Sequence, residues 1–233
     1  MLLPLTALVL LANPHFCGES PNDRPSASVG RPANGHVDGA VALVETTAVQ
    51  ILPLRHKARC LQWGTPRLVA ALQHAGDAVQ SQVPASPPLG VGNIGRAQGG
   101  SIKPYSHSHN AGRDCDLAFY ATKKGNPVAA DDLHHFSADL RSDTGSLTFD
   151  TARNWHLIAA LLGDSTISVR WIFVSEPLKK VLLTHARASK VAPELLEAAE
   201  EKLHQPSDAP AHDDHFHLRI RCTADERAAG CVD

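Results

Sequence analysis

The sequence predicts an α+β fold, an antiparallel sheet with helices on one side and a cluster of histidine and aspartate side chains on its other face. One segment alternates strictly between polar and apolar residues, and a second begins with the same alternation, which is typical of half-buried strands. Further strands are expected near the beginning and the middle of the chain, and the helical segments fall in groups between them. Helices grouped in this way can cover one face of an antiparallel sheet.

The alternating segments lie at residues 114–120 and 215–222. Successive side chains on a strand point to opposite faces, so each segment would present one polar and one apolar face. In the first segment, Asp114 and Asp116 share the polar face. The polar face of the second segment carries His215, His217, Arg219 and Arg221. If the two strands are neighbours, Asp116 and His217 can reach one ion.

The other elements follow from local signals. Residues 41–54 are apolar and β-branched enough for one or two strands. Thr65-Pro66 is a typical helix start, and Gly76 is the expected stop. Residues 84–100 are rich in proline and glycine and predict a loop, either a plain surface loop or one that a peptide substrate approaches closely. The remaining elements are a hairpin turn at 123–127, a helix at 150–162, a strand at 166–174, helices at 177–188 and 193–204, and a loop at 206–210.

Length and composition predict one folded domain over residues 41–233, because 233 residues suit a single core. The apolar run at 1–12 has the length of a signal-peptide core rather than of a membrane span, although a buried strand is the alternative. Residues 13–40 are rich in proline, glycine and polar residues and are expected to form a flexible leader. A net charge of −2 gives no basic surface for nucleic acid.

Five cysteines without a Cys-x-x-Cys pair favour an exported protein with one or two disulfides. A bridge between Cys222 and Cys231 would fix the end of the chain, and a second bridge could join Cys17 to Cys60, but the spacing leaves other pairings open. Cys115 is expected on the apolar face of its strand as a reduced core residue.

Two remote stretches supply metal ligands. Residues 106–116 contain His109 and Asp116, and residues 212–219 contain the His-x-His pair His215 and His217. Two imidazoles and one carboxylate are a sufficient protein set for a catalytic Zn²⁺, which keeps its fourth position for water. The alternative is a surface histidine cluster beside an aspartate that caps the core.

The same stretches resemble the penicillin-insensitive murein endopeptidases, on Ser-His-x-x-Gly-x-Asp-x-Asp at 108–116 and Asp-His-x-His-x-Arg at 214–219. That family is similar to the lysostaphin-type enzymes, the D-Ala-D-Ala dipeptidases and the hedgehog amino-terminal domain. The resemblance extends from about Trp63 to the carboxyl end.

The resemblance implies that His109, Asp116 and His217 bind zinc, that His215 lies beside the zinc-bound water, and that His212 supports it. Family members can carry a further histidine where this chain has Ser106, so a second metal is not expected.

The hypothesis for function is zinc-assisted hydrolysis of an amide bond, with histidine as the base because no His-Glu-x-x-His is present. His215 would move the proton or only orient a ligand; His212 is the other proton carrier or packs in the loop. Asp114 is expected to support a ligand, and Arg219 either attracts a substrate carboxylate or is a plain exposed arginine.

The resemblance implies peptidoglycan stem peptides as the partner and a cut between D-alanine and the diamino acid of the cross-link, in the periplasm or outside the cell. The alternatives are a D,D- or L,D-carboxypeptidase of the same zinc group and a non-catalytic zinc-stabilised binding module. The oligomeric state is left open.

Overall fold

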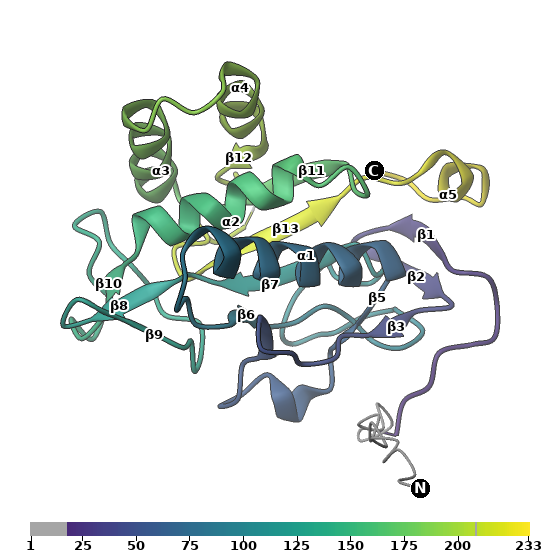
Figure 1. The fold of residues 1–233 in the computed structure, drawn as a ribbon. Coiled ribbons are helices and arrows are strands. Elements are labelled where there is room, and N and C mark those ends of the chain that lie inside the picture. Colours follow the sequence, from purple (N-terminus) through teal and green to yellow (C-terminus); the bar gives the residue numbers. More distant parts are fainter. Residues whose placement is uncertain (1–17, 208) are drawn as a thin grey trace, which may run out of the picture.

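A computed structural model describes residues 18–207 and 209–233, and its centre is a six-stranded sheet (Figure 1). The two middle strands are β13 and β7, the two alternating segments of the sequence. In spatial order the strands are β12 (Leu203–His204), β11 (Val169–Phe173), β13 (His215–Ile220), β7 (Asp114–Ala118), β6 (Leu89–Val91) and β4 (Val49–Ile51). The three inner pairs are antiparallel, as predicted, while the outer pairs β11–β12 and β4–β6 are parallel.

The register between β7 and β13 brings the polar residues of both strands onto one face. His217 pairs with Asp116, and Arg219 pairs with Asp114. The apolar residues between them, including Leu117 and Phe216, are fully buried on the opposite face. The alternation that predicted these strands therefore also fixes which side of the sheet carries the charged groups.

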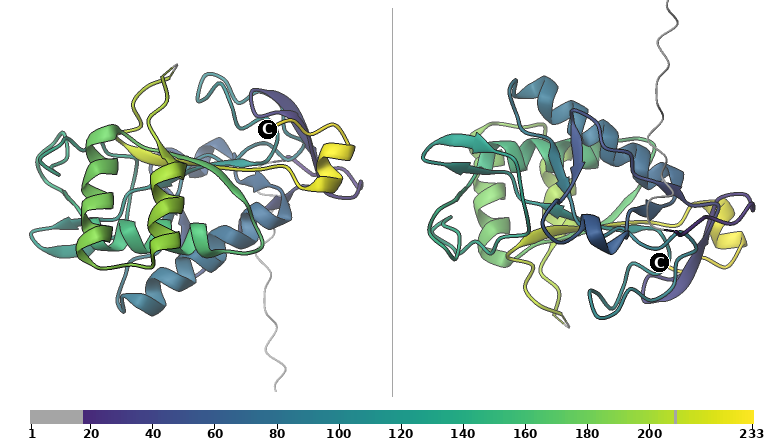
Figure 2. Two further views of the ribbon diagram at one scale, coloured as in Figure 1. Left: turned by 90° about the horizontal axis from the view of Figure 1, so that it is seen from above. Right: turned by 90° about the horizontal axis from the view of Figure 1, so that it is seen from below.

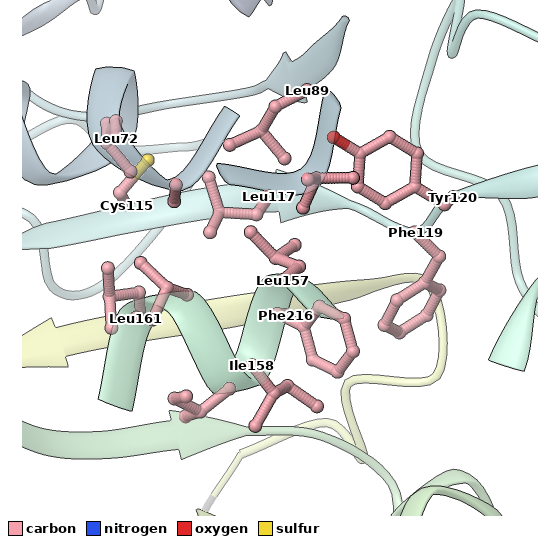
Figure 3. Close-up of a cluster of buried hydrophobic side chains, with 14 of the residues drawn as sticks. Leu72, Leu89, Cys115, Leu117, Phe119, Tyr120, Leu157, Ile158, Leu161 and Phe216 are labelled. Atoms are coloured by element: carbon pink, nitrogen blue, oxygen red, sulfur yellow. The ribbon is translucent and has the colours of Figure 1, made fainter. Parts of the chain in front are cut away.

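Four helices cover the apolar face. Figure 3 shows Leu117 and Phe216 facing Leu157 and Ile158 of one of these helices, and all four side chains are fully buried. The helices are α1 (Pro66–Gln82), α2 (Thr151–Gly163), α3 (Glu176–Ala188) and α4 (Pro193–Lys202). The predicted α+β class, with helices on one side of the sheet, is confirmed. Among the described residues, no helix combines the length and hydropathy needed to cross a bilayer.

The remaining elements are short. The predicted turn at 123–127 joins β8 (Ala121–Lys123) to β9 (Asn126–Val128), and β10 (Thr148–Phe149) pairs with β8. The strands expected at 41–54 are β3 (Val41–Ala42) and β4. Strand β3 pairs with β5 (Trp63–Gly64). A 3-10 turn at η2 (Lys57–Arg59) and a terminal helix α5 (Ala224–Ala228) complete the list.

The structure corrects three local expectations. Helix α1 does not stop at Gly76 but continues to Gln82. The glycine is explained by close packing, because an added Cβ at this position would be only 2.5 Å from the Ala48 carbonyl oxygen. The segment 84–100 contains strand β6, whose three residues are all buried although glycine and proline surround them. The helix expected at 193–204 ends at Lys202, and its last two expected residues form the edge strand β12.

The expectation of a flexible leader over 13–40 is wrong for the hairpin of β1 (Ala27–Arg31) and β2 (Asn34–Asp38). Residues far along the chain hold this hairpin in place. Buried Ser28 accepts a hydrogen bond from Arg113 Nε at 2.8 Å, and Gly30 N–H donates to the Gly230 carbonyl at 3.0 Å. A polar composition predicted disorder because these partners are not visible locally. The apolar run at 1–12 lies outside the described residues.

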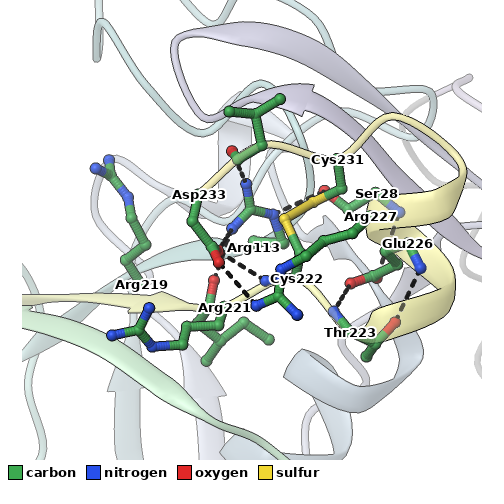
Figure 4. Close-up of polar contacts among 12 residues, drawn as sticks. Ser28, Arg113, Arg219, Arg221, Cys222, Thr223, Glu226, Arg227, Cys231 and Asp233 are labelled. Carbon is green, nitrogen blue, oxygen red and sulfur yellow. Dashed lines mark hydrogen bonds and ion pairs between the residues drawn. A yellow bond between two sulfur atoms is a disulfide. The ribbon is translucent and has the colours of Figure 1, made fainter.

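The predicted bridge between Cys222 and Cys231 is present, and Cys115 is a buried free cysteine, as expected. Cys17, the expected partner of Cys60, lies outside the described residues. Figure 4 shows that the bridge stands beside a second fastening of the tail, the fully buried Arg113. Its Nη2 donates to the Val232 carbonyl at 2.9 Å. Because Arg113 directly precedes β7, the tail is tied to a strand that carries the polar cluster.

Candidate metal centre

Three side chains predicted to bind metal meet on the open face of the sheet. Asp116 and His217 come from paired positions on β7 and β13, and His109 comes from the loop before β7. His109 Nε2 lies 3.1 Å from Asp116 Oδ1, and His217 Nδ1 lies 3.5 Å from the same oxygen. The side chains of all three are at least 93% buried. Residues more than 100 positions apart in the sequence therefore converge on one point.

In each of the two imidazoles, one nitrogen donates its hydrogen to a neighbouring acceptor. The other nitrogen is then left with a lone pair that faces Asp116. His109 Nδ1 lies 2.8 Å from the Ile94 carbonyl, and His217 Nε2 lies 2.9 Å from Asp114 Oδ1. Both of these partners can only accept, so these ring nitrogens carry the hydrogens. His109 Nε2 is buried without a hydrogen-bond partner among the described residues. Two nitrogen lone pairs and a carboxylate oxygen facing one another could hold a metal ion between them, and this donor set suits Zn²⁺.

The ionisation of these groups is consistent with a cation site. Burial lowers the pKa of His217 to about 4, so the ring is neutral near pH 7 and its lone pair is available. Burial alone would raise the pKa of Asp116, but His109 and His215 outweigh it and hold the pKa well below its usual value. Burial also opposes protonation of His109, yet Asp116 raises its pKa overall. The carboxylate thus favours positive charge at this position.

Asp114 supports the cluster from behind. This fully buried carboxylate accepts hydrogen bonds through Oδ1 from His217 Nε2 and from Arg219 Nε at 2.6 Å. Burial raises the pKa of Asp114, but Arg219 and His217 reverse the effect, so the net pKa is lowered and the group is ionised. An ionised acceptor fixes both the tautomer and the orientation of the His217 ring.

Asn93 and Arg59 are supporting residues that the sequence analysis missed. Asn93 is buried and donates through Nδ2 to Asp116 Oδ2 at 2.8 Å, and Arg59 Nη1 donates to Asn93 Oδ1 at 3.1 Å. The Arg59 guanidinium in turn lies 4.2 Å from the ring centre of the exposed Tyr105. Asn93 stands in the glycine-rich segment before the motif, where the residue types alone give no sign of contact with Asp116.

The two predicted catalytic histidines lie beside the cluster. His215 Nε2 is 3.3 Å from Asp116 Oδ1, and His215 Nδ1 is 2.7 Å from Asp214 Oδ1. Burial opposes protonation of His215, but Asp116 and Asp214 outweigh it and raise its pKa to about 10. The ring of His212 lies 4.9 Å from that of His215 and 5.5 Å from that of His217, with Nδ1 at 2.7 Å from the Pro210 carbonyl.

A cleft of about 600 Å³ opens over these residues. Its walls are the 105–108 segment on one side and the 206–212 loop on the other, and Asp116, His215 and His217 lie between them. Figure 2 shows both loops on the side of the sheet opposite to α1 and α2. Ser106 lines the cleft, and His107 is exposed beside it, as expected. The volume is in the range of small-molecule and peptide sites.

Another His and Asp group lies nearby but has other partners. His135 Nδ1 is 2.8 Å from Asp213 Oδ1, and Asp214, the third member, binds His215. The His135 side chain is 60% exposed. These contacts are ion pairs at the surface, whereas the side chains of His109, Asp116 and His217 in the main cluster are buried.

Comparisons with known proteins identify the family of this chain. A model of the penicillin-insensitive murein endopeptidase family matches residues 28–233. The match begins with the β1–β2 hairpin, earlier than the resemblance found in the sequence motifs. A search of curated proteins finds no match to this chain. Because the family match covers most of the chain, the protein belongs to the penicillin-insensitive murein endopeptidase family.

Proposed function

We propose that this chain is a zinc-dependent endopeptidase that hydrolyses the peptide cross-link of peptidoglycan between D-alanine and the diamino acid of the neighbouring stem. Membership of a murein endopeptidase family supports the substrate class. The observation that carries the zinc dependence is the convergence of His109 Nε2, Asp116 Oδ1 and His217 Nδ1 at the floor of the cleft. These three residues are the proposed ligands.

A zinc ion at this position would supply a Lewis acid for the scissile carbonyl and would lower the pKa of a bound water to about 7. The protein groups do the rest of the work. Asp114 and Asn93 hold the ligands in orientation, and the buried floor limits access of bulk solvent. Such support is what keeps a catalytic geometry fixed.

We assign the proton transfer to His215, with His212 as the other candidate. Asp214 accepts the Nδ1 proton of His215, and the Pro210 carbonyl accepts that of His212, so Nε2 of each ring can exchange a proton. His215 Nε2 is the nearer to Asp116. Against the effect of burial, the charge of Asp116 raises the pKa of His215 while that carboxylate is uncompensated. With Asp116 bound to a cation, Nε2 of His215 would take one proton from the attacking water and deliver it to the departing amine as the carbon–nitrogen bond breaks.

The hydrolysis would take place in the periplasm or outside the cell. The disulfide between Cys222 and Cys231 favours an oxidising compartment, and the substrate of the family is the cell wall. A leader at residues 1–12 would direct the export.

The test is digestion of isolated sacculi by purified protein, with and without a chelator, followed by mass analysis of the products. We expect cross-linked dimers to be converted to monomers, with loss of activity after chelation and recovery on addition of Zn²⁺. Release of free terminal amino acids from monomers would indicate a carboxypeptidase instead. Zinc binding without any product would indicate a binding module.

A further inference from the structure

Arg219 is a fixed cation in the wall of the cleft. It lies two residues beyond His217 on the same face of β13, and it lines the cleft together with His215 and His217. Its Nε donates to Asp114 at 2.6 Å, and its guanidinium carbon lies 5.4 Å from the centre of the Phe173 ring. These two contacts hold the planar group in one place, although the side chain is still 21% exposed.

The outer edge of this guanidinium is unused. Within the part of the chain that the structure describes, neither Nη1 nor Nη2 of Arg219 makes a hydrogen bond. A guanidinium offers five donors, and its terminal pair matches the two oxygens of a carboxylate. A residue that served only to neutralise Asp114 would not need to be open to the cleft.

Its position relative to the cluster restricts the carboxylate it can bind. Two residues on one strand are separated by about 6.7 Å, so Arg219 stands one strand repeat away from His217. If the scissile amide lies at the cluster, a carboxylate on the carbon attached to its nitrogen is only two bonds from that nitrogen. Such a group can reach a cation at this spacing.

We propose that Arg219 is a specificity-determining residue, which binds the carboxylate carried by the carbon next to the scissile nitrogen, on the amine side of the bond. This inference rests on the proposed function, since it assumes that the amide is cut at the cluster. The inference therefore favours a diamino acid whose cross-linked amine stands on a carbon that also carries a carboxylate, over one whose amine ends a plain alkyl chain.

Arg221 provides a matched control for Arg219. It lies two residues further along and does not line the cleft. Figure 4 shows both arginines beside the strand and outside the Arg113 network. Changing Arg221 removes a positive charge from the same part of the molecule without touching the Asp114 contact.

The experiment compares two synthetic cross-linked peptides that differ only in this carboxylate, which is free in one and amidated in the other. Zinc-loaded wild-type protein, R219Q and R221Q are assayed for kcat/KM, and zinc content is measured for each. We expect wild type and R221Q to prefer the free carboxylate by roughly 10- to 150-fold, the effect of one hydrogen-bonded charge. R219Q should cleave both peptides at the lower rate.

R219K serves as a second variant that keeps a positive charge beside Asp114, in case loss of that contact impairs folding or zinc binding in R219Q. Lysine keeps the charge but not the planar fork, so it should retain part of the preference. Wild type alone also decides: equal cleavage of both peptides overturns the assignment while leaving the proposed function intact. Cleavage of neither peptide overturns the proposed function and this inference with it. Full preference retained by zinc-loaded R219Q overturns the inference alone, and so does a preference in zinc-loaded R219K that is fully lost although wild type and R221Q keep theirs and R219Q keeps part of it.

Discussion

Nε2 of His217 lies 2.9 Å from Oδ1 of Asp114, and both side chains are buried. The contact determines which nitrogen of the imidazole faces the cleft, because the nitrogen bonded to the carboxylate must carry the hydrogen. Nδ1 is then left with its lone pair toward Asp116. Asp114, which is not itself a proposed ligand, therefore orients the proposed ligand His217.

Replacing Asp114 by Asn should weaken zinc binding without abolishing it. The amide is nearly the same size, but it loses the charge that favours the Nε2–H tautomer of His217. We expect zinc affinity to fall by about 10- to 100-fold. Competition with a chromogenic chelator measures this. D164N is the matched control, because Asp164 also binds a histidine, His74, at 3.0 Å, but lies at the end of helix α2, away from the cluster. Equal affinities in D114N and D164N would contradict the assigned role.

Replacing Asn93 by Ala removes the donor to Asp116 Oδ2 and leaves part of a buried carboxylate without its partner. We expect zinc affinity to fall by about 10-fold or more. The control is N154A: Asn154 is equally buried but bonds to the Tyr120 backbone, so its loss should lower stability and leave zinc affinity unchanged. An N93A protein with wild-type affinity would remove Asn93 from the support of the cluster.

Replacing His215 by Ala should separate metal binding from hydrolysis. Zinc content should stay at one equivalent, because the proposed ligands are untouched, while turnover of muropeptide dimers should fall by roughly 10² to 10⁴. H217A and D116A should lose zinc and activity together. H185A, on helix α3, serves as the histidine control. If H212A shows the large loss of turnover and H215A does not, the proton carrier is His212.

Removing the disulfide should lower stability and leave the cluster assembled. The bridge joins residues nine positions apart, and closing a loop of that size contributes about 2.5 kcal/mol. We expect the free energy of unfolding of C222S/C231S, measured by urea denaturation, to be lower than that of the wild type by this amount. Arg113 should still hold the tail through Ser28 and Val232, so zinc content should remain at the wild-type level. Loss of zinc from the double variant would show that the tail fixes the strands more strongly than expected.

The stability of the protein should depend on pH through His56. This side chain is 2% exposed, and burial together with Arg59 lowers its pKa to about 4. A histidine with a lowered folded-state pKa binds a proton more readily when unfolded, so stability is complete above pH 6.5 and falls as pH decreases toward 4. The loss should approach about 3 kcal/mol. Urea unfolding at several pH values measures it, and H56Q should show a shallower dependence; an identical dependence in H56Q would contradict the assignment.

Much of the site could be predicted because strand alternation is local. The period of two in β7 and β13 put Asp116 and His217 on one face, and the register then placed them opposite each other. The assignment of His109 depended on family resemblance, since it stands in a loop with φ of +69°, which no periodicity describes.

The parts that could not be predicted depend on contacts between remote residues. Asn93 carries no motif, and its role exists only because β6 leads it to Asp116. The β1–β2 hairpin has the composition of a leader, and only Arg113 and the tail give it a fixed position. Gly76 has the chemistry of a helix stop, but its close approach to Ala48 explains its place inside α1.

The most direct test of the metal centre is a crystal of the zinc-loaded protein measured above and below the zinc absorption edge. We predict one strong anomalous peak in contact with His109 Nε2, Asp116 Oδ1 and His217 Nδ1. A peak held instead by the His135, Asp213 and Asp214 group, or no peak at full zinc loading, would contradict the proposed centre.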